Sequence, residues 1–572
     1  MDNPNDALRP DQSSPPQDEL TQDELKSSSA SANEADDLPQ YEPLTPELVE
    51  DEAIRGDFML RGAAVLLAVL LAWTVIDRTE ILVHVKTGQY LITHGLLPPA
   101  TDVFSATAEG RPWVNLSWLW DLLLGAIYNT VGESGLSILS AVIAFVTFWL
   151  VSRLSLPGVS TWWGSVCAVL AALACFPSLT VTPHIMTLLC ITVTLWLLYR
   201  WQWDASHSLW PMVGLFLFWG NLDGRAWIGG VLLLSFTIGA VLDGLRTLPT
   251  DARKLSLETL GFVTIASLLA LLVHPFLWET WLSPYWLYSV EYPVLQAYVT
   301  SDLPCVRTLP CCCSKVLAGF WSLQCISFVV DDDRECDAIT EPRTFAIILS
   351  MCIIGDESDW YFRRAELAVA SLVNAVIATV NGQEWYKANF RMTYSVDPWE
   401  LVWSRGGRAV TVLAIFLLAF AAVSGHLVGG QGRRIGMGYS PQLKHELESY
   451  ERILDDAIDD RAFNFRLQQG DVLIWSGWKP FIDSRIRLYA GEDSLFHQHQ
   501  SLRVEMREQD QQLPGAEPLT WKKEFDKYAI YQTLPRLTGK SPDHQTYHDL
   551  LMSPNWQLTS QGQRQRSLRE QI

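Results

Sequence analysis

Basic residues are scarce in this sequence. The 572 residues include 42 Lys+Arg against 63 Asp+Glu, which gives a formal net charge of −21. A nucleic-acid partner would require clustered basic side chains to neutralise phosphates, so none is expected. Much of the excess acid lies in residues 1–57, which hold 16 Asp+Glu and three Lys+Arg. Because this segment also has few large apolar side chains, it cannot offset its ordering entropy and is predicted to be a disordered acidic tail.

Several catalytic sequence patterns are also absent. The chain has no Walker-type phosphate loop, no G-x-S-x-G and no H-E-x-x-H. The NTPase, serine hydrolase and zincin classes therefore have no support from motifs.

The ten cysteines lack the paired C-x-x-C spacing of a zinc site, so no metal site is predicted. Seven of them fall within residues 303–365, together with an acidic run at 331–337, and this segment does not match its surroundings. We hypothesise a reading-frame shift that is restored near Glu366. Resequencing the gene and finding the same cysteines in close relatives would exclude it.

Apolar runs, in contrast, are abundant. The chain is 49% hydrophobic with 25 Trp, and several runs reach the roughly 17–25 residues that cross a bilayer. Trp and Tyr stand mostly at the ends of these runs, as in an interfacial belt. The predicted fold is mainly α, with a multi-pass transmembrane helical bundle over residues 58–428 and the lipid bilayer as its partner. The expected spans are 58–76, 135–152, 161–177, 185–201, 209–220, 227–245, 257–276, 366–380 and 408–428.

Residues 429–572 have a different composition. They are charged and mixed, with short apolar alternations, and are long enough for a core of their own. Apolar positions in 442–460 recur with helical spacing, which predicts an amphipathic helix. We therefore expect a C-terminal soluble α/β domain.

The distribution of Lys and Arg predicts the topology. The apolar stretch 116–130 is short and contains Asp121, and it either crosses the membrane or lies along its surface. If it lies on the surface and the N-terminus is cytoplasmic, then Arg153, Arg200 and Arg246 fall inside. The turns near residues 182–184, 221–225 and 274–276 then share the outer side with a loop at 77–131. We prefer this topology because crossing would move the basic residues outside.

Distinctive motifs stand in the loop at 77–131 and in later turns. They are the segments 80–84, 86–88, 95–98, 102–107 and 110–119, then the turns 182–184, 221–224 and 274–275, and 480–485 with 488–489 in the soluble part. In these segments the chain resembles a group of bacterial multi-pass proteins of the GT-C glycosyltransferase type. The sequence departs from the pattern at three places: Leu82-Val83 replaces an aromatic pair, Glu80 replaces Asp, and Thr182 replaces Arg.

The resemblance implies a reaction. GT-C enzymes use a polyprenyl-phosphate sugar donor on the extracytoplasmic side, and an acid of the first outer loop serves as base or metal ligand. Glu80 or Asp77 would be this catalytic acid, and a divalent cation stays open as a cofactor. The resemblance also implies the inner membrane of a bacterial envelope, with the C-terminal domain outside. The expected substrate-binding residues are His84, Lys86, Asp102, Arg111, His184, Asp223, Arg225 and His274.

Most of these residues also have a structural alternative. Glu80, His84 and Lys86 could form the solvated face of a helix, and Asp102 could cap a turn. Asp223 with Arg225, and Asp483 with Arg485, could be ion pairs, and His274 could end a helix. For the whole protein, a non-catalytic membrane scaffold is the alternative. A transporter has less support, because no inverted pair of broken spans is visible.

Overall fold

The computed structural model describes 13 ranges of the chain, and the statements below concern these ranges. The chain divides into two compact units, Met1–Ile54 and Arg55–Ile572. Helix α2 (Pro46–Ala72) begins inside the segment 1–57 that was predicted to be disordered. The cysteine-rich segment 303–365 lies outside the described residues except for its last two. The described ranges are 46–154, 162–203, 207–246, 251–291, 364–389, 398–426, 434–455, 460–490, 495–507, 520–530, 532–534, 556–561 and 566–570.

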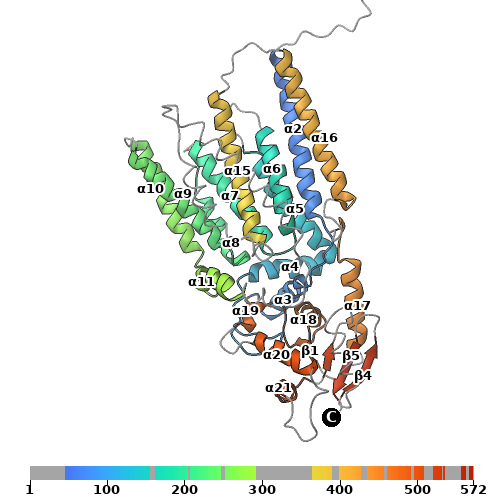
Figure 1. Ribbon diagram of the computed structural model, residues 1–572. Helices are drawn as coiled ribbons and strands as arrows, with labels where there is room; N and C mark the ends of the chain where they lie inside the picture. Colours follow the sequence, from blue (N-terminus) through green and yellow to red (C-terminus); the bar gives the residue numbers. More distant parts are fainter. Residues whose placement is uncertain are drawn as a thin grey trace, which may run out of the picture. The chain divides into compact units, whose positions relative to one another are not determined.

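A bundle of apolar helices makes up most of the second unit (Figure 1). Three helical segments are long and apolar enough to cross a membrane: Glu133–Ser152, His184–Gln202 and Gly406–Val423. Five shorter apolar helices accompany them. The first expected span, 58–76, corresponds to the second half of α2, which ends at Ala72. The bundle helices are α2, α5 (Glu133–Ser152), α6 (Trp162–Cys175), α7 (His184–Trp203), α8 (Pro211–Leu222), α9 (Trp227–Arg246), α10 (Asp251–Ala270), α15 (Arg364–Asn389) and α16 (Pro398–Val423).

The bundle has apolar side chains both inside and outside. Its core draws on nearly all of these helices, with Phe148, Phe216 and Trp219 among the fully buried rings. On the outside, Phe416 and Phe420 of α16 are more than half exposed. A helix that is apolar on its outer side suits a lipid environment and is unfavourable in water.

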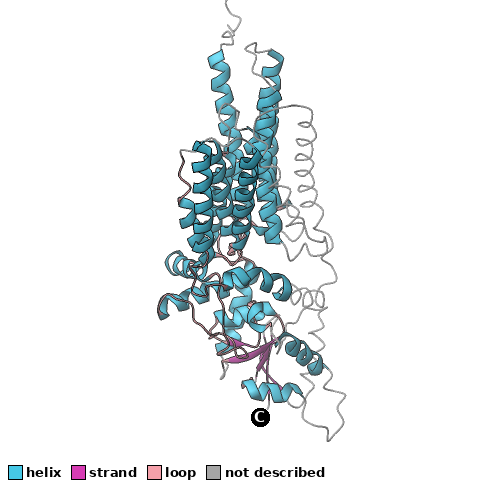
Figure 2. Ribbon diagram, turned by 90° about the vertical axis from the view of Figure 1, so that its left-hand side faces the viewer, coloured by secondary structure: helices cyan, strands magenta, loops and turns pink. Residues whose placement is uncertain are grey.

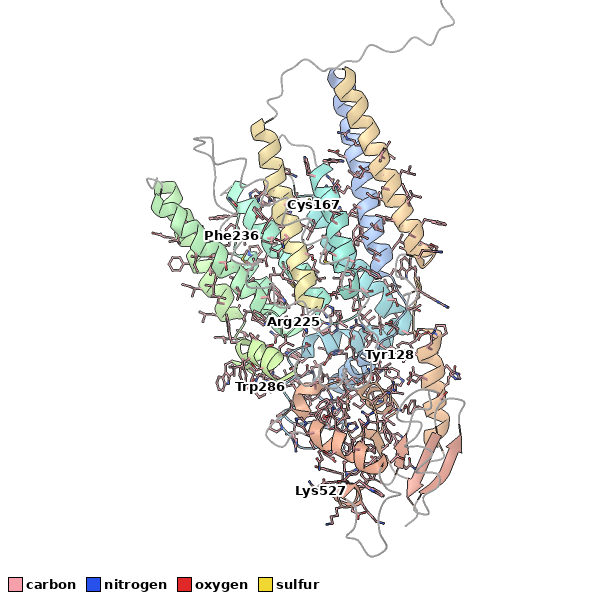
Figure 3. The ribbon with its side chains drawn as sticks, in the orientation of Figure 1. Tyr128, Cys167, Arg225, Phe236, Trp286 and Lys527 are labelled. Carbon is pink, nitrogen blue, oxygen red and sulfur yellow. The ribbon has the colours of Figure 1, made fainter. Side chains whose placement is uncertain are left out.

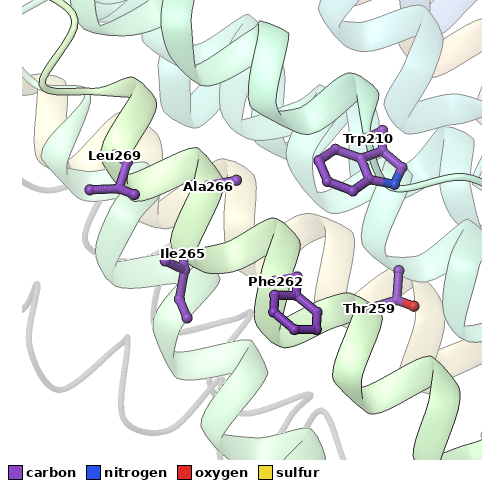
Figure 4. Close-up of a pocket in the computed structure, with 6 residues that line it drawn as sticks. All are labelled: Trp210, Thr259, Phe262, Ile265, Ala266 and Leu269. Atoms are coloured by element: carbon purple, nitrogen blue, oxygen red, sulfur yellow. The ribbon is translucent and has the colours of Figure 1, made fainter.

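A groove of about 370 Å³ lies on this outer surface between α10 and the start of α8. Thr259 is its single polar lining residue, so it suits an acyl chain better than a polar substrate. Figure 4 shows the lining residues Trp210, Thr259, Phe262, Ile265, Ala266 and Leu269.

Two short helices of the outer loop, α3 (Glu80–His94) and α4 (Trp118–Val131), cross each other at one end of the bundle (Figure 1). They meet at Gly88 and Gly125, where a Cβ on Gly88 would lie 1.9 Å from the backbone oxygen of Asp121. Only glycine permits this approach of two backbones. Helix α4 thus lies at the end of the bundle (Figure 1).

The C-terminal residues form helices and a five-stranded sheet of order β2-β1-β3-β5-β4. Strand β1 is parallel to β2 and β3, whereas β5 is antiparallel to β3 and β4. Figure 2 shows the strands grouped together away from the helical bundle. The elements are α17 (Pro441–Asp455), β1 (Arg461–Asn464), α18 (Leu467–Trp475), β2 (Lys479–Pro480), α19 (Ile486–Tyr489), α20 (Leu495–Arg507), α21 (Thr520–Tyr528), β3 (Gln532–Leu534), β4 (Trp556–Gln561) and β5 (Arg566–Glu570).

The outer loop and the C-terminal residues share a core. Ala106, Ala108 and Trp113 are buried in one cluster with the aromatic rings of β1 and of α21. The backbone N–H of Ala106 donates to the carbonyl of Pro480 at 2.9 Å, next to the end of β2. The C-terminal residues are therefore part of the same compact unit as the bundle, and the outer loop folds against them.

Candidate functional site

The residues singled out from the sequence lie at one end of the bundle. Helices α5, α7 and α9 begin there, and α6, α8 and α10 end there, beside α3 and α4 (Figure 1). Glu80, His184, Asp223 and His274 therefore lie at the same end, which a shared site requires. Their immediate contacts differ. One group lies at α3, a second surrounds Asp102 and Arg485, a third lies at the turns after α8 and α10, and His184 contacts its own turn.

The start of α3 carries the two candidate catalytic acids. Asp77 is exposed in the segment just before the helix, and Glu80 is its first residue. The Nη1 atom of Arg78 donates to Oε1 of Glu80 at 3.1 Å, and both side chains are about one-third exposed. Both carboxylates are thus reachable from solvent.

One turn further along α3, His84 contacts a buried carboxylate. Its Nδ1 lies 2.6 Å from Oδ1 of Asp121, whose other oxygen accepts from Nδ2 of Asn115 at 2.7 Å. Burial disfavours the charged imidazole, but Asp121, with smaller contributions from Glu80 and Asp471, raises the pKa of His84 above its ordinary value. His84 and Asp121 thus form an ion pair that joins α3 to α4.

Helix α18 of the C-terminal part also contacts α3 and the residue just before it. Nζ of Lys86 donates to the carbonyl of Trp475 at 3.2 Å, at the end of α18 where a cation is favoured. Oγ1 of Thr79 donates to Oδ2 of Asp471 at 2.7 Å. Burial, reinforced by the neighbouring Asp483, raises the pKa of Asp471 to about 7. Lys86 therefore has a structural partner at the end of α18.

Asp102 is buried and serves two structural roles. It accepts from the backbone N–H of Ser105 at 3.0 Å, which caps its turn, and from Nη1 of Arg485 at 2.5 Å. Arg485 also donates from Nε and Nη2 to both oxygens of Asp483, at 2.9 and 2.7 Å. Its guanidinium lies 4.8 Å from the ring centre of Trp113. Asp102 thus caps a turn and Asp483 forms an ion pair with Arg485, as the structural alternatives from the sequence proposed.

The Arg485 cluster was not foreseen as a link between distant segments. Although burial disfavours its charge, Asp483 and Asp102 hold the pKa of Arg485 above its ordinary value. Asp102 and Arg485 are 383 positions apart in the sequence, and no local pattern relates them. Arg111 closes the same turn through its backbone, since its carbonyl accepts from the N–H of Asp102 at 2.9 Å.

The turns after α8 and α10 border an open apolar cavity of about 640 Å³. Nε1 of Trp118 donates to Oδ1 of Asn221 at 2.9 Å, and Nδ2 of Asn221 donates to the carbonyl of Val273, also at 2.9 Å. Nδ1 of His274 accepts from the N–H of Phe276. The cavity thus offers apolar walls with two polar side chains, Asn221 and His274. Its lining residues are Trp118, Leu119, Leu217, Phe218, Asn221, Leu272, Val273, His274, Pro275 and Leu277.

The turn after α8 continues from this cavity into a charged region. Asp223 accepts from Oγ1 of Thr187 at 2.7 Å, and its Oδ1 lies 3.7 Å from Nη1 of Arg225. Burial raises the pKa of Glu291 above its ordinary value, although the nearby cations Arg225 and Arg487 act in the opposite direction. The Asp223–Arg225 pair was one of the alternatives from the sequence, and Arg487 was not foreseen.

His184 lies in its own turn at the start of α7. Its Nδ1 and Nε2 lie 3.0 and 3.1 Å from Oγ1 of Thr182, and Nε2 lies 3.1 Å from the carbonyl of Ser178. These contacts hold the ring against the preceding segment. Across the described ranges, no group of three or more His, Cys, Asp or Glu side chains is placed to hold a metal ion.

Comparisons with known proteins bear on the fold. No protein-family model matches the chain, and no curated protein matches it. Among solved structures, it is similar to the oligosaccharyltransferase of Archaeoglobus fulgidus, determined as a complex with zinc and sulfate. The likeness has a TM-score of 0.50 at 13% identity, and covers 83% of this chain and 67% of that one. The chain therefore has a mainly helical fold similar to that of this oligosaccharyltransferase, and its apolar helices indicate a membrane location.

Proposed function

We propose that this GT-C-like chain is a glycosyltransferase of the bacterial envelope that moves a sugar from a polyprenyl-phosphate donor. The observation that carries the proposal is the gathering of the polar turns of α3, α7, α8 and α10 at one end of the bundle, beside an apolar cavity. A lipid-linked donor needs both properties at one place, an apolar surface for its chain and polar groups for its phosphate.

The cavity and the turn after α8 would bind the donor. The isoprenoid chain would lie along the apolar walls formed by Leu217, Phe218 and Leu277. The phosphate would approach Arg225, whose guanidinium is partly exposed. Arg225 lies in the same turn as Asn221, which lines the cavity. A cation at this place stabilises the negative charge that develops on the departing phosphate.

Asp77 and Glu80 would supply the base. As the bond between the anomeric carbon and the phosphate oxygen breaks, a new bond forms to the acceptor hydroxyl oxygen. The proton of that hydroxyl passes to the carboxylate, and the lipid phosphate leaves with the bonding electrons. Both carboxylates are reachable from solvent, as an acceptor would require.

A scaffold is the second candidate, and a specific observation favours it. Asp102, Asp121 and Asp471 are buried, and each accepts hydrogen bonds that join the outer loop to itself or to the C-terminal part. Such contacts fix the outer loop against the C-terminal part, and a scaffold needs this rigidity even if it catalyses no reaction. Assembly or docking of envelope components on this surface would then be the function.

Activity of the Glu80→Gln and Asp77→Asn variants tests the proposal. Reconstituted protein should incorporate labelled sugar from polyprenyl-phosphate donors, and loss of the general base should lower the rate about 10²–10⁴-fold. Glu109→Gln is the matched control, because Glu109 is an exposed acid of the same loop that pairs with Lys479. Full activity of both variants would remove these acids from the mechanism. A wild-type chain without activity towards any such donor would favour the scaffold.

A further inference from the structure

Helix α11 (Glu279–Trp286) has its apolar side turned outward. Trp278, Trp281, Leu282 and Tyr285 follow the helical spacing i, i+3, i+4, i+7 and are 63%, 36%, 43% and 60% exposed. We call these four residues the aromatic stripe. They include three aromatic rings on one side of a helix that has only two turns.

The opposite side of α11 is polar and buried. Thr280 and Ser283 are 1% and 8% exposed, and they point into the protein with Leu287. In water the opposite arrangement is stable, because apolar side chains are then removed from solvent. The inversion in α11 indicates that the medium outside the aromatic stripe is apolar.

The orientation of α11 is fixed from its side. Nη2 of Arg487, in α19, donates to Oε2 of Glu279 at 2.5 Å, and its guanidinium lies 4.8 Å from the ring centre of Trp286. Trp286 is labelled in Figure 3. Glu279 and Trp286 are about two helical turns apart and so lie on the same side of α11. The contact with Arg487 therefore holds one flank of the helix and leaves the aromatic stripe facing outward.

The aromatic stripe continues the outer surface of the bundle. Leu269, in the last turn of α10, and Val273, three residues after the helix, are 58% and 60% exposed, and Leu277 follows them before the stripe. This outer surface of α10 also carries the groove lined by Phe262 and Ile265. A single apolar surface thus runs from the middle of α10 onto α11.

We propose that α11 is an in-plane helix of the membrane surface, with the aromatic stripe inserted in the headgroup–acyl boundary of the bilayer. Trp and Tyr favour that boundary because each ring has an apolar body and a polar tip. The ion pair of Glu279 with Arg487 lies on the flank that faces the C-terminal part. This proposal depends on the membrane location and not on the proposed enzymatic activity.

The position of α11 sets the depth of the larger cavity. His274, Pro275 and Leu277 line that cavity and immediately precede the helix. If the aromatic stripe lies at the boundary, the cavity opens at the level where a lipid changes from acyl chain to headgroup. A membrane lipid could then enter it sideways.

Photo-crosslinking in nanodiscs tests the proposal. The full chain is reconstituted in phosphatidylcholine with phosphatidylglycerol that carries a diazirine either near the glycerol or at the chain end. We expect the glycerol-proximal probe to label the aromatic stripe several-fold more than the chain-end probe does. Thr280 and Ser283 should stay unlabelled, and Ile265 should favour the chain-end probe. Absence of lipid labelling on the stripe, with Phe416 of α16 labelled normally, would overturn the proposal.

A pair of variants sharpens the test. W281E with Y285E should lower lipid labelling at Trp278 several-fold, because two carboxylates disfavour insertion. V504E is the control, since Val504 is an exposed apolar residue of α20 in the C-terminal part, and it should leave the labelling unchanged. Unchanged labelling of Phe416 shows that a variant is folded. Cross-linking of the stripe to a second protein in native membranes, without lipid adducts, would contradict the proposal.

Discussion

At the residue scale, Arg485 joins parts of the chain that the sequence keeps apart. It donates to Asp102 of the outer loop and to both oxygens of Asp483, and all three side chains are largely buried. A buried ion pair adds little when it is complete, but breaking it leaves charges without compensation. Removing Arg485 would therefore leave the buried carboxylates of Asp102 and Asp483 without a cation.

We expect Arg485→Met to destabilise the chain by about 3–5 kcal/mol, because two buried carboxylates lose their cation. Thermal unfolding in detergent measures the effect. Lys527→Met is the matched control, since Lys527 forms an exposed pair with Glu524 and such pairs contribute about 0–1 kcal/mol. Adding Asp102→Asn and Asp483→Asn to Arg485→Met should recover part of the loss. Equal effects of the two single variants would disprove this role of Arg485.

Asp471 predicts a dependence of stability on pH. Its pKa is about 7 in the folded chain and about 3.9 in an unfolded one, so the folded state retains the proton between these values. Stability should then fall as pH rises from 4 to 7, by up to about 1.4 kcal/mol per pH unit, and level off above 7. The raised pKa of His84 acts in the same direction, with its stabilisation lost as pH rises through the folded value.

Melting temperatures measured from pH 5 to 8 test this expectation. Asp471→Asn should flatten the slope between pH 5 and 7, because the amide does not titrate. His84→Gln should reduce only the part of the slope near neutral pH. Parallel curves for the wild type and Asp471→Asn would show that this carboxyl does not titrate as expected.

At the element scale, the crossing of α3 and α4 depends on two glycines. A Cβ on Gly88 would lie 1.9 Å from the carbonyl oxygen of Asp121, and one on Gly125 would lie 2.5 Å from the carbonyl carbon of Gly88. Backbone atoms cannot yield as a flexible side chain can. The helices must therefore separate if either glycine is replaced, and the contact of His84 with Asp121 would be lost with them.

We expect Gly88→Ala to lower the melting temperature and the yield of folded protein, with a loss of more than about 3 kcal/mol from strain. Gly214→Ala is the control, because a Cβ at Gly214 of α8 meets nothing within 4 Å. That change should be neutral or stabilise the helix by about 0.5–1 kcal/mol. A Gly88→Ala variant as stable as Gly214→Ala would show that the two helices are farther apart.

Periodicity and local motifs predicted the elements better than the contacts between them. The apolar runs predicted the bundle helices, and the short stretch with Asp121 predicted a helix outside the bundle, since such patterns depend on local spacing. The pairing of Thr79 with Asp471 and of Asp102 with Arg485 could not be predicted, because it depends on contacts across more than 380 positions. The inverted polarity of α11 was missed because its segment is too short for a clear period.

At the scale of the whole molecule, the proposed topology has a direct test. We expect the N-terminus in the cytoplasm and the polar end of the bundle outside, so a phosphatase reporter fused after Ser440 should be active. A fusion after Arg153, at the opposite end of α5, should be inactive because that end is expected to be cytoplasmic. The reverse pattern would place the C-terminal residues and the polar end of the bundle in the cytoplasm and would contradict the proposed topology.

The shared core of the outer loop and the C-terminal residues has a consequence for biogenesis. Oγ1 of Thr107 donates to the carbonyl of Phe481, 374 positions later in the chain. A ribosome therefore completes the loop long before it makes the residues that the loop packs against. Trp113 of the nascent loop therefore stays uncovered until the C-terminal residues that pack against it have been synthesised. A truncated product would keep its helices but present an unfinished loop, which proteases could recognise.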